Sequence, residues 1–300
     1  MNADKKIAVI IINWKKYDFT LNCIDSVLKS SYKNFKIILI DNESQNGFPD
    51  EINNSDKIHI IKNKNNEGFA RANNQGIKYS IKNGFDYVLL LNNDTVIKND
   101  LLYLLMKHSN TFNQKIIQPL ILNYDRSKIW NAGGTINNFF GTFKTLNKGE
   151  SFKNFKSNRN LTEWFTGCCV LIKTDVFKDI GYFDERFFAY YEDVDFSIRL
   201  KSKGYSVAMM NDSYLKHFES ASSKSINQNE GNLSPYVHYL NIRNHILILK
   251  KHSKSFNPIG ILIYQLIKIL SYLIYFLFRF RFNKFKMVSK GFIDAVNFIK

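Results

Sequence analysis

Short apolar runs recur through the first third of the chain, and segments with helical spacing separate them. Each run is the length of a strand and rich in β-branched residues, as expected where both faces of a sheet are covered. This alternation predicts the α/β class, with a mainly parallel mixed sheet flanked by helices. The predicted strands are Ile7–Ile12, Phe35–Ile40, Ile58–Ile61 and Tyr87–Leu91, and the predicted helices include Glu67–Asn83 and a segment that Asp18 or Thr20 caps.

Polar side chains follow three of these runs: Asn13, Asp41, and the segment from Asn92 to Asp94. Ligands of parallel α/β sheets bind beyond the carboxyl ends of the strands, so a site is expected at this edge. The chain has no GxGxxG after its first strand and no GxxxxGK[ST] anywhere. Their absence argues against a dinucleotide oxidoreductase and a P-loop NTPase.

Carboxylate, amide and hydroxyl oxygens at Asn92, Asp94 and Thr95 suit a hard divalent cation such as Mg²⁺ or Mn²⁺. A turn at the end of a strand is the alternative reading. His217 follows a later predicted strand, Ser206–Met210, and is either a further ligand or a structural histidine.

Five acidic residues gather in one short segment of this net-basic chain, beside the aromatic run Phe187–Tyr191. Aromatic neighbours raise the pKa of a carboxyl group and so favour a general base. The alternative is a solvated acidic turn, with Arg199 neutralising one of its members. The acids are Asp184, Glu185, Glu192, Asp193 and Asp195.

The net charge of +16 indicates an anionic partner, but it is unevenly spread. Residues 243–300 hold eleven Lys and Arg against Asp294 alone, a net +10, which leaves +6 for the first 242 residues. The positive charge therefore belongs to an apolar tail. A nucleic-acid-binding protein, the reading that charge alone favours, predicts a basic groove or a reader motif, and neither is evident.

The tail contains Ile259–Phe278, with Lys268 as its one charged residue. A helix of this length is roughly 30 Å long, close to a bilayer core. Polar and amphipathic residues form one stripe along it, and basic residues interleaved with phenylalanines follow. A helix lying on an anionic membrane face, a single span and a buried core helix all remain open. The start of the chain lacks the apolar region of a signal peptide, so we expect the cytoplasmic face of the membrane and a peripheral attachment through residues 256–290.

Four ordered stretches combine these features. They are Val9–Trp14 with Ile40–Ser44, Asn65–Gly76, Leu90–Thr95, and Gly167–Ile172 with Ile180–Arg199. With His217 they extend through most of the chain, and in this order they resemble the family 2 inverting glycosyltransferases of the GT-A fold, especially rhamnosyltransferase-like bacterial members.

The resemblance implies a role for each matching residue. Asp193 is the implied catalytic base, and Glu192 orients it or the acceptor. Asp94 is the implied metal ligand that ends a DxD motif, with Asn92 in place of the first acid, and His217 is the second ligand of Mn²⁺ or Mg²⁺. The implied donor-binding residues are Asn13, Asp41, Asn42, Asn66, Gly68, Arg71, Asn74, Asn92 and Asn93, and the implied acceptor-binding residues are Trp164, Gly167 and Tyr191.

The implied reaction transfers a sugar from a UDP- or dTDP-sugar to a glycan or polyprenyl-diphosphate-linked acceptor, with no nucleic acid as partner. We expect a donor-binding half in residues 1–125, an acceptor-binding and catalytic half in 126–245, and an amphipathic membrane-associated tail in 246–300. A nucleotidyltransferase that acts on a sugar phosphate is the alternative. Such enzymes open with a Gly-rich basic loop, where this chain has Asn13-Trp14-Lys15-Lys16.

Overall fold

The computed structural model describes residues 5–43, 48–157, 159–218 and 233–298. Contacts between residues divide the chain into two units. The first comprises Met1–Thr135, Thr145–Phe188 and Glu192–Glu219, and the second Ile136–Lys144, Ala189–Tyr191 and Ser220–Lys300.

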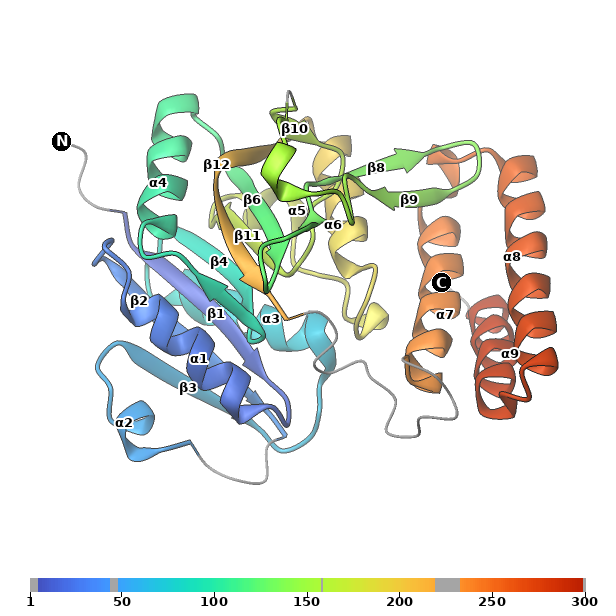
Figure 1. The fold of residues 1–300 in the computed structure, drawn as a ribbon, viewed down its shortest axis with the longest axis horizontal. Coiled ribbons are helices and arrows are strands. Elements are labelled where there is room, and N and C mark those ends of the chain that lie inside the picture. The colour runs from blue at the N-terminus through green and yellow to red at the C-terminus, as the bar shows by residue number, and fades with distance from the viewer. Residues whose placement is uncertain (1–4, 44–47, 158, 219–232, 299–300) are drawn as a thin grey trace. The chain divides into compact units, whose positions relative to one another are not determined.

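A mixed sheet forms the centre of the first unit, with strand order β10-β12-β6-β11-β4-β1-β2-β3 (Figure 1). The neighbours β4, β1, β2 and β3 run parallel, whereas β11 is antiparallel to both β4 and β6. Two short strands lie off this path, β5 beside β12 and β7 beside β6. The strands are β1 (Ile7–Asn13), β2 (Phe35–Asn42), β3 (Ile58–Asn63), β4 (Tyr87–Asn92), β5 (Thr95–Ile97), β6 (Ile116–Asn123), β7 (Ile129–Asn131), β10 (Leu161–Thr162), β11 (Cys169–Lys173) and β12 (Val207–His217).

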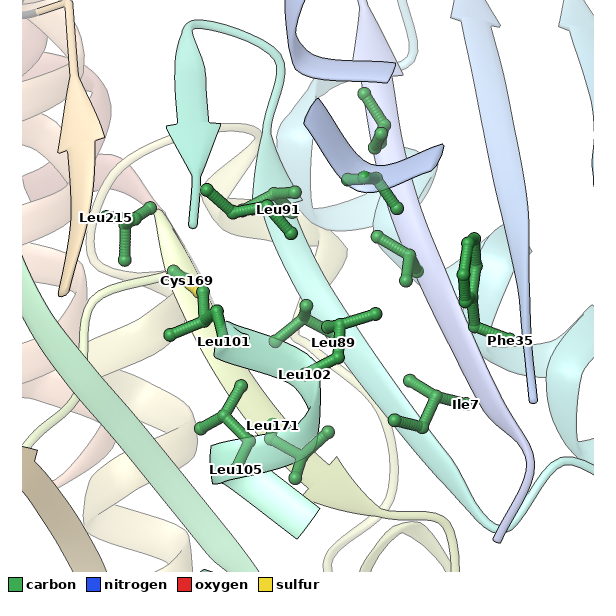
Figure 2. Close-up of a cluster of buried hydrophobic side chains, with 14 of the residues drawn as sticks. Ile7, Phe35, Leu89, Leu91, Leu101, Leu102, Leu105, Cys169, Leu171 and Leu215 are labelled. Atoms are coloured by element: carbon green, nitrogen blue, oxygen red, sulfur yellow. The ribbon is translucent and has the colours of Figure 1, made fainter. Parts of the chain in front are cut away.

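Helices cover both faces of this sheet because the strand residues are apolar on both sides. Alternate residues of β1, β2 and β4 pack against α1 and α4 in one cluster, which Figure 2 shows. The intervening residues pack against α3, α5 and α6 in a second cluster. The helices of the first unit are α1 (Tyr17–Leu28), α2 (Asp50–Asn53), α3 (Gly68–Lys82), α4 (Leu101–Phe112), α5 (Val176–Ile180) and α6 (Glu192–Ser202), with short 3-10 helices at Phe152–Asn154 and Glu185–Phe187.

Three helices make up most of the second unit: α7 (Pro235–Lys251), α8 (Pro258–Phe278) and α9 (Phe282–Asn297). They share a small apolar cluster that includes Ile242, Ile269, Phe276 and Val288. A short 3-10 helix, Ser253–Ser255, lies between α7 and α8, and β8 (Gly134–Asn137) and β9 (Thr142–Thr145) form a separate two-stranded sheet.

The predicted α/β class is confirmed, and so are the four predicted strands and the helix ending before Gly84. The predicted cap of the first helix is wrong, because α1 begins at Tyr17, so Thr20 lies inside the helix. The predicted strand Ser206–Met210 continues to His217. The expected boundary between residues 245 and 246 falls inside α7.

The long apolar helix of the tail is α8. Unlike a helix of a water-soluble protein, it exposes apolar side chains and directs polar ones inward. Only 11% of its apolar stretch is buried inside the protein, so the alternative prediction of a buried core helix is wrong. Leucines and isoleucines of α8 are exposed, whereas Gln265 and Lys268 from the predicted polar stripe turn inward, to the ring of His245 on α7. By length and composition α8 is the one helix in the described part of the chain that is suited to crossing a membrane.

Candidate active site

The carboxyl edge of the sheet brings together residues from three strands. Asn13 at the end of β1 is in register with Asp41 on β2, and its neighbour Ile12 is in register with Asn92 on β4. Asn13 Nδ2 lies 3.5 Å from the Asp41 carboxylate, and both side chains are buried. The predicted cluster at this edge therefore exists.

Thr20 on α1 extends this cluster, and the sequence analysis did not give it a place in the site. Its hydroxyl donates to Asn13 Oδ1 at 2.6 Å and accepts from Asn93 Nδ2 at 2.9 Å. One buried hydroxyl thus connects the end of β1 to the turn that follows β4. The hydroxyl also contacts the Lys16 carbonyl oxygen one turn earlier, an ordinary helical contact that gives no sign of the site.

Asn42 organises the loop that leads into α3. Its side chain donates to Asn66 Oδ1 at 2.8 Å, and its own oxygen accepts from the Glu67 amide at 3.0 Å. Asn66 Oδ1 also accepts from the amide of Gly68. Gly68 has φ +79°, and a Cβ there would lie 2.5 Å from the ring of Phe188, so only glycine fits.

Asp94 and His217 meet because β5 and β12 pair with Thr95 opposite His217. Asp94 Oδ1 lies 3.1 Å from His217 Nε2. Both residues are buried, and within the described residues neither Asp94 Oδ1 nor His217 Nδ1 has a hydrogen-bond partner. A carboxylate oxygen and an imidazole nitrogen that face each other at this distance, with no hydrogen bond to Asp94 Oδ1 from the described residues, fit a divalent cation. The described residues contain no group of three or more His, Cys, Asp or Glu that could hold one alone.

The segment Gly167–Cys168 joins this edge to the acidic segment. The Gly167 amide donates to Asp193 Oδ2 at 3.0 Å, and the Cys168 carbonyl accepts from the Asn92 amide at 2.8 Å. Burial is the main cause that raises the pKa of the Cys168 thiol, and the charges of Asp94 and Asp193 both add to the rise. Asp94 and Asp193 therefore both lie close to one short backbone segment.

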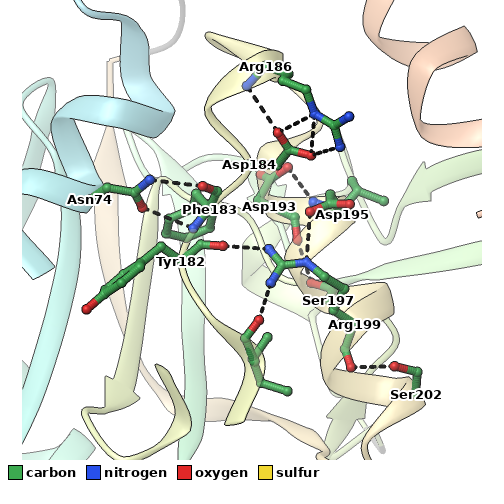
Figure 3. Close-up of polar contacts among 12 residues, drawn as sticks. Asn74, Tyr182, Phe183, Asp184, Arg186, Asp193, Asp195, Ser197, Arg199 and Ser202 are labelled. Atoms are coloured by element: carbon green, nitrogen blue, oxygen red, sulfur yellow. Dashed lines mark hydrogen bonds and ion pairs between the residues drawn. The ribbon is translucent and has the colours of Figure 1, made fainter. Parts of the chain in front are cut away.

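Three of the five clustered acids have a cationic partner. Asp184 pairs with Arg186, and Asp195 pairs with Arg199, which also donates to the carbonyl oxygens of Ile180 and Tyr182 (Figure 3). Glu185 pairs with Arg71 at 3.5 Å. The expected neutralisation by Arg199 is confirmed.

No ion pair reaches Glu192 or Asp193 within the described residues. Both lie in the first turn of α6, where the helix dipole favours negative charge. Burial raises the pKa of Asp193, and the amides of Gly167 and Val194 oppose that rise. Burial, followed by the charge of Asp193, raises the pKa of Glu192 well above its ordinary value. Asp193 is half-buried, so a substrate can reach it, whereas Glu192 is enclosed.

Two predicted donor-binding residues have other uses in the structure. The amide of Asn74 is buried, donates to the Phe183 carbonyl and accepts from the Phe183 amide (Figure 3). It also donates to Glu185. Because no hydrogen of this amide is left over, we assign Asn74 to holding the loop after α5. Arg71 is half-exposed and pairs with Glu67 at 2.9 Å.

Each of the predicted acceptor residues makes contacts within the protein. The indole of Trp164 is buried against Gly134, and its N–H donates to the Thr135 carbonyl, so no face is open for sugar stacking. Gly167 holds Asp193 by its amide. The ring of Tyr191 stacks on His245 at 5.4 Å, and Tyr190 is the more exposed aromatic of this segment.

The sequence model described as Glycosyl transferase family 2 matches residues 8–181, more than half of the chain. The dTDP-rhamnosyl transferase RfbF of Shigella flexneri is 26% identical over 255 residues, which cover 84% of this chain and 82% of RfbF.

Two solved structures share the fold. GalNAc-T7, solved with UDP, GalNAc and Mn²⁺, has a TM-score of 0.61 at 13% identity, over 83% of this chain and 48% of its own. The mannosyltransferase PcManGT of Pyrobaculum calidifontis, solved with GDP-Man and Mn²⁺, has a TM-score of 0.58 at 11% identity, over all of this chain and 77% of its own.

Proposed function

From the premise that this chain belongs to glycosyl transferase family 2 and is a glycosyltransferase, we propose that it transfers a sugar from a UDP- or dTDP-sugar to a lipid-linked or cell-surface glycan. The transfer inverts the configuration at the anomeric carbon of the sugar. The observation that carries this proposal is the arrangement around Gly167–Cys168. That segment bonds the half-buried Asp193 carboxylate through the Gly167 amide and the start of the Asn92-to-Asp94 turn through the Cys168 carbonyl.

The donor nucleotide belongs at the carboxyl edge of the sheet. Asp41 and Asn13 offer acceptors and donors for the base and ribose, and Thr20 fixes their orientation through Asn13. Asn42 and Asn66 hold the loop before α3 in place, and they therefore shape this site from its border. RfbF, named for a dTDP-sugar, supports a deoxythymidine donor.

Asp94 and His217 would hold the divalent cation, with Asn92 and Asn93 beside them. When bound, Mn²⁺ or Mg²⁺ stabilises negative charge on the departing diphosphate as a Lewis acid. Asp94 and His217 would therefore supply two of the cation's ligands. Mn²⁺ in the structures of GalNAc-T7 and PcManGT supports a cation here.

Asp193 is the proposed general base. The acceptor hydroxyl gives its proton to the Asp193 carboxylate as its oxygen forms a bond to the anomeric carbon. The bond from that carbon to the diphosphate oxygen breaks, and the nucleoside diphosphate leaves with the electron pair. A base whose pKa is raised by burial holds that proton more readily than an exposed Asp. Attack opposite the leaving group inverts the anomeric centre.

The second unit is the proposed membrane-binding part. Exposed apolar side chains of α8 are suited to the acyl region, and the exposed basic residues Arg279, Lys286 and Lys290 to anionic headgroups. Attachment at the cytoplasmic face would bring the enzyme to a polyprenyl-diphosphate-linked acceptor. The exposed leucines, isoleucines and phenylalanine of α8 are Ile259, Leu262, Ile263, Leu266, Ile267, Leu270, Ile274, Leu277 and Phe278.

A ligand panel tests the proposal. Thermal stability of the full chain is measured with UDP, dTDP and GDP and their sugars, with and without Mn²⁺, because a ligand that binds the folded state stabilises it. We expect one nucleotide series to stabilise the protein, more strongly with Mn²⁺, and Asp94→Ala to remove the Mn²⁺-dependent part. Release of pyrophosphate from a nucleoside triphosphate, without sugar transfer, would establish the nucleotidyltransferase instead.

A further inference from the structure

The turn that leads into Glu192 and Asp193 is held in an unusual backbone conformation. Phe188, Tyr190 and Tyr191 have φ values of +62°, +69° and +74°. Residues with a Cβ rarely adopt this region, and bulky aromatic residues least of all. Three such residues within four positions persist only where surrounding contacts hold them. The contacts around this turn therefore show what keeps the catalytic segment in shape.

The chain enters the turn at Phe188, whose carbonyl oxygen accepts from the Ala70 amide at 3.0 Å. Further along, both carbonyl oxygens of Ala189 and Tyr190 accept from one side chain, Asn244 on α7. Each of these two hydrogen bonds from Asn244 Nδ2 is 2.8 Å long. The chain then passes through Tyr191 directly into Glu192.

Asn244 is suited to this task by burial and by the orientation of its amide. The side chain is fully buried. Its oxygen accepts from Arg243 Nε at 2.8 Å, which leaves Nδ2 to face the turn. Both hydrogens of Nδ2 are thus directed at carbonyl oxygens of the turn, and a residue without two donors at this position could not make both bonds.

The next residue of α7 supports the same turn. The His245 ring stacks on Tyr191 with an interplanar angle of 14°. That ring is itself fixed, since Nε2 lies 2.7 Å from the Gly141 carbonyl oxygen and Nδ1 lies 2.6 Å from Lys268 Nζ. Two consecutive residues of α7 therefore contact three consecutive residues of the turn.

We propose that Asn244 is a positioning residue for the transfer reaction, which acts by holding the Ala189–Tyr191 turn and, through it, the Asp193 carboxylate. The inference rests on the proposed role of Asp193. Misplacement of a catalytic group by about 1 Å costs on the order of a hundredfold in rate. Loss of both hydrogen bonds should therefore lower kcat and leave binding of the donor nucleotide at the sheet edge unchanged.

The test compares Asn244→Asp, which keeps the shape and removes both donors, with Asn244→Ser, which keeps one donor in a smaller side chain. Asn257→Ala is the matched control, because the Asn257 side chain also belongs to the second unit, caps α8, and among the described residues makes no hydrogen bond to the turn. Measurements are kcat with the nucleotide-sugar that the wild type turns over, affinity for the corresponding free nucleotide, and thermal stability.

We expect Asn244→Asp to lower kcat by about 10- to 100-fold, with nucleotide affinity unchanged, and Asn244→Ser to fall between it and the wild type. Asn257→Ala should lose stability but keep kcat. A wild-type kcat in both Asn244 variants, or a loss of kcat matched by an equal loss of nucleotide affinity, would overturn the inference. A wild type that turns over no nucleotide-sugar contradicts the proposed function instead, so the two failures are distinguishable.

Discussion

Helices α3 and α8 lie in different units and have opposite polarity. On α3 the buried positions include Ala70, Ala72 and Ile77, and lysines such as Lys78 are exposed. On α8 leucines and isoleucines are exposed, whereas Lys268 is directed at His245. The first pattern is that of a helix in water, and the second is suited to an apolar surrounding.

The polar contacts of α8 show that its inward polarity is specific. Burial lowers the pKa of Lys268 to about 8. Burial and the charge of Lys268 lower the pKa of His245 to about 3, so the imidazole stays neutral and accepts from the ammonium group. We therefore expect the first unit to hold the reacting groups, with Asn244 of the second unit acting only through the Ala189–Tyr191 turn, and the second unit to present an apolar surface. Each variant below should affect one of these and leave the other unchanged.

The largest effect is expected for Asp193→Asn. The amide keeps the shape of the side chain but cannot take the proton of the acceptor hydroxyl, and general bases contribute about 10²- to 10⁴-fold to rates. We expect kcat for sugar transfer to fall by about that factor, while membrane binding and nucleotide affinity persist. A variant that transfers sugar at the wild-type rate at equal expression would exclude Asp193 as the base.

The next effect tests the second unit alone. The triple substitution Leu262→Ser, Leu266→Ser and Ile274→Ser removes three exposed apolar side chains of α8. Full burial of such a side chain is worth roughly 1.5–3 kcal/mol, so we expect binding to anionic lipid vesicles to fall by at least about a hundredfold. Turnover with a water-soluble acceptor should not change.

Substitution is preferable to deletion here, because α8 and α9 share an apolar cluster with α7 and their removal would expose it. The matched control is Tyr103→Ser with Phe112→Ser, two exposed aromatic residues of α4 in the first unit. If this control reduces vesicle binding as much as the triple variant does, α8 is not the membrane-binding helix.

The strands of the first unit were predictable because burial on both faces leaves continuous apolar runs such as Ile7–Ile12. The proximity of the candidate site residues Asn13 and Asp41 was also predictable, since parallel strands end at one edge of the sheet. The orientation of α8 was not, because the sequence shows a polar stripe but not which side of the helix packs on the protein.

Roles that depend on hydrogen-bond partners far along the chain were harder to predict. Asn74 and Trp164 have the residue types of a sugar-binding site, yet their polar atoms bind backbone groups at Phe183 and Thr135. The roles of Thr20 and Asn244 were not predicted, because neither residue type nor position suggests a site. Each has an ordinary place on a helix, and its contacts depend on tertiary packing.

A smaller effect, again confined to the first unit, is expected for Thr20→Val. Valine has the same shape but leaves the Asn13 oxygen and the Asn93 amide without the hydroxyl they share. An unmade buried hydrogen bond costs about 1–3 kcal/mol, so we expect about tenfold weaker binding of the donor nucleotide, measured by titration calorimetry, and recovery in Thr20→Ser. Ser26→Ala removes a buried hydroxyl of the same helix that bonds Cys23 and Ile97, and nucleotide affinity should not change in this control.

The smallest effect is expected for Glu192, a buried carboxyl group of the first unit that has no ion pair among the described residues. The buried charge of the second unit, Lys268, has a partner in His245. Burial raises the pKa of Glu192, so the folded state retains its proton at pH values where the unfolded chain has released it. The contribution of this group to stability is complete below the ordinary Glu pKa of about 4.3 and is lost as the pH rises through the raised value. Glu192→Gln cannot ionise and therefore does not lose this stability.

In thermal unfolding, we expect the Glu192→Gln variant to match the wild type near pH 4 and to become more stable than the wild type by a few degrees as the pH rises. The gain should shrink in an Asp193→Asn background, because the Asp193 charge contributes to the raised pKa. A stability difference that does not depend on pH would show that folding does not raise the pKa of Glu192.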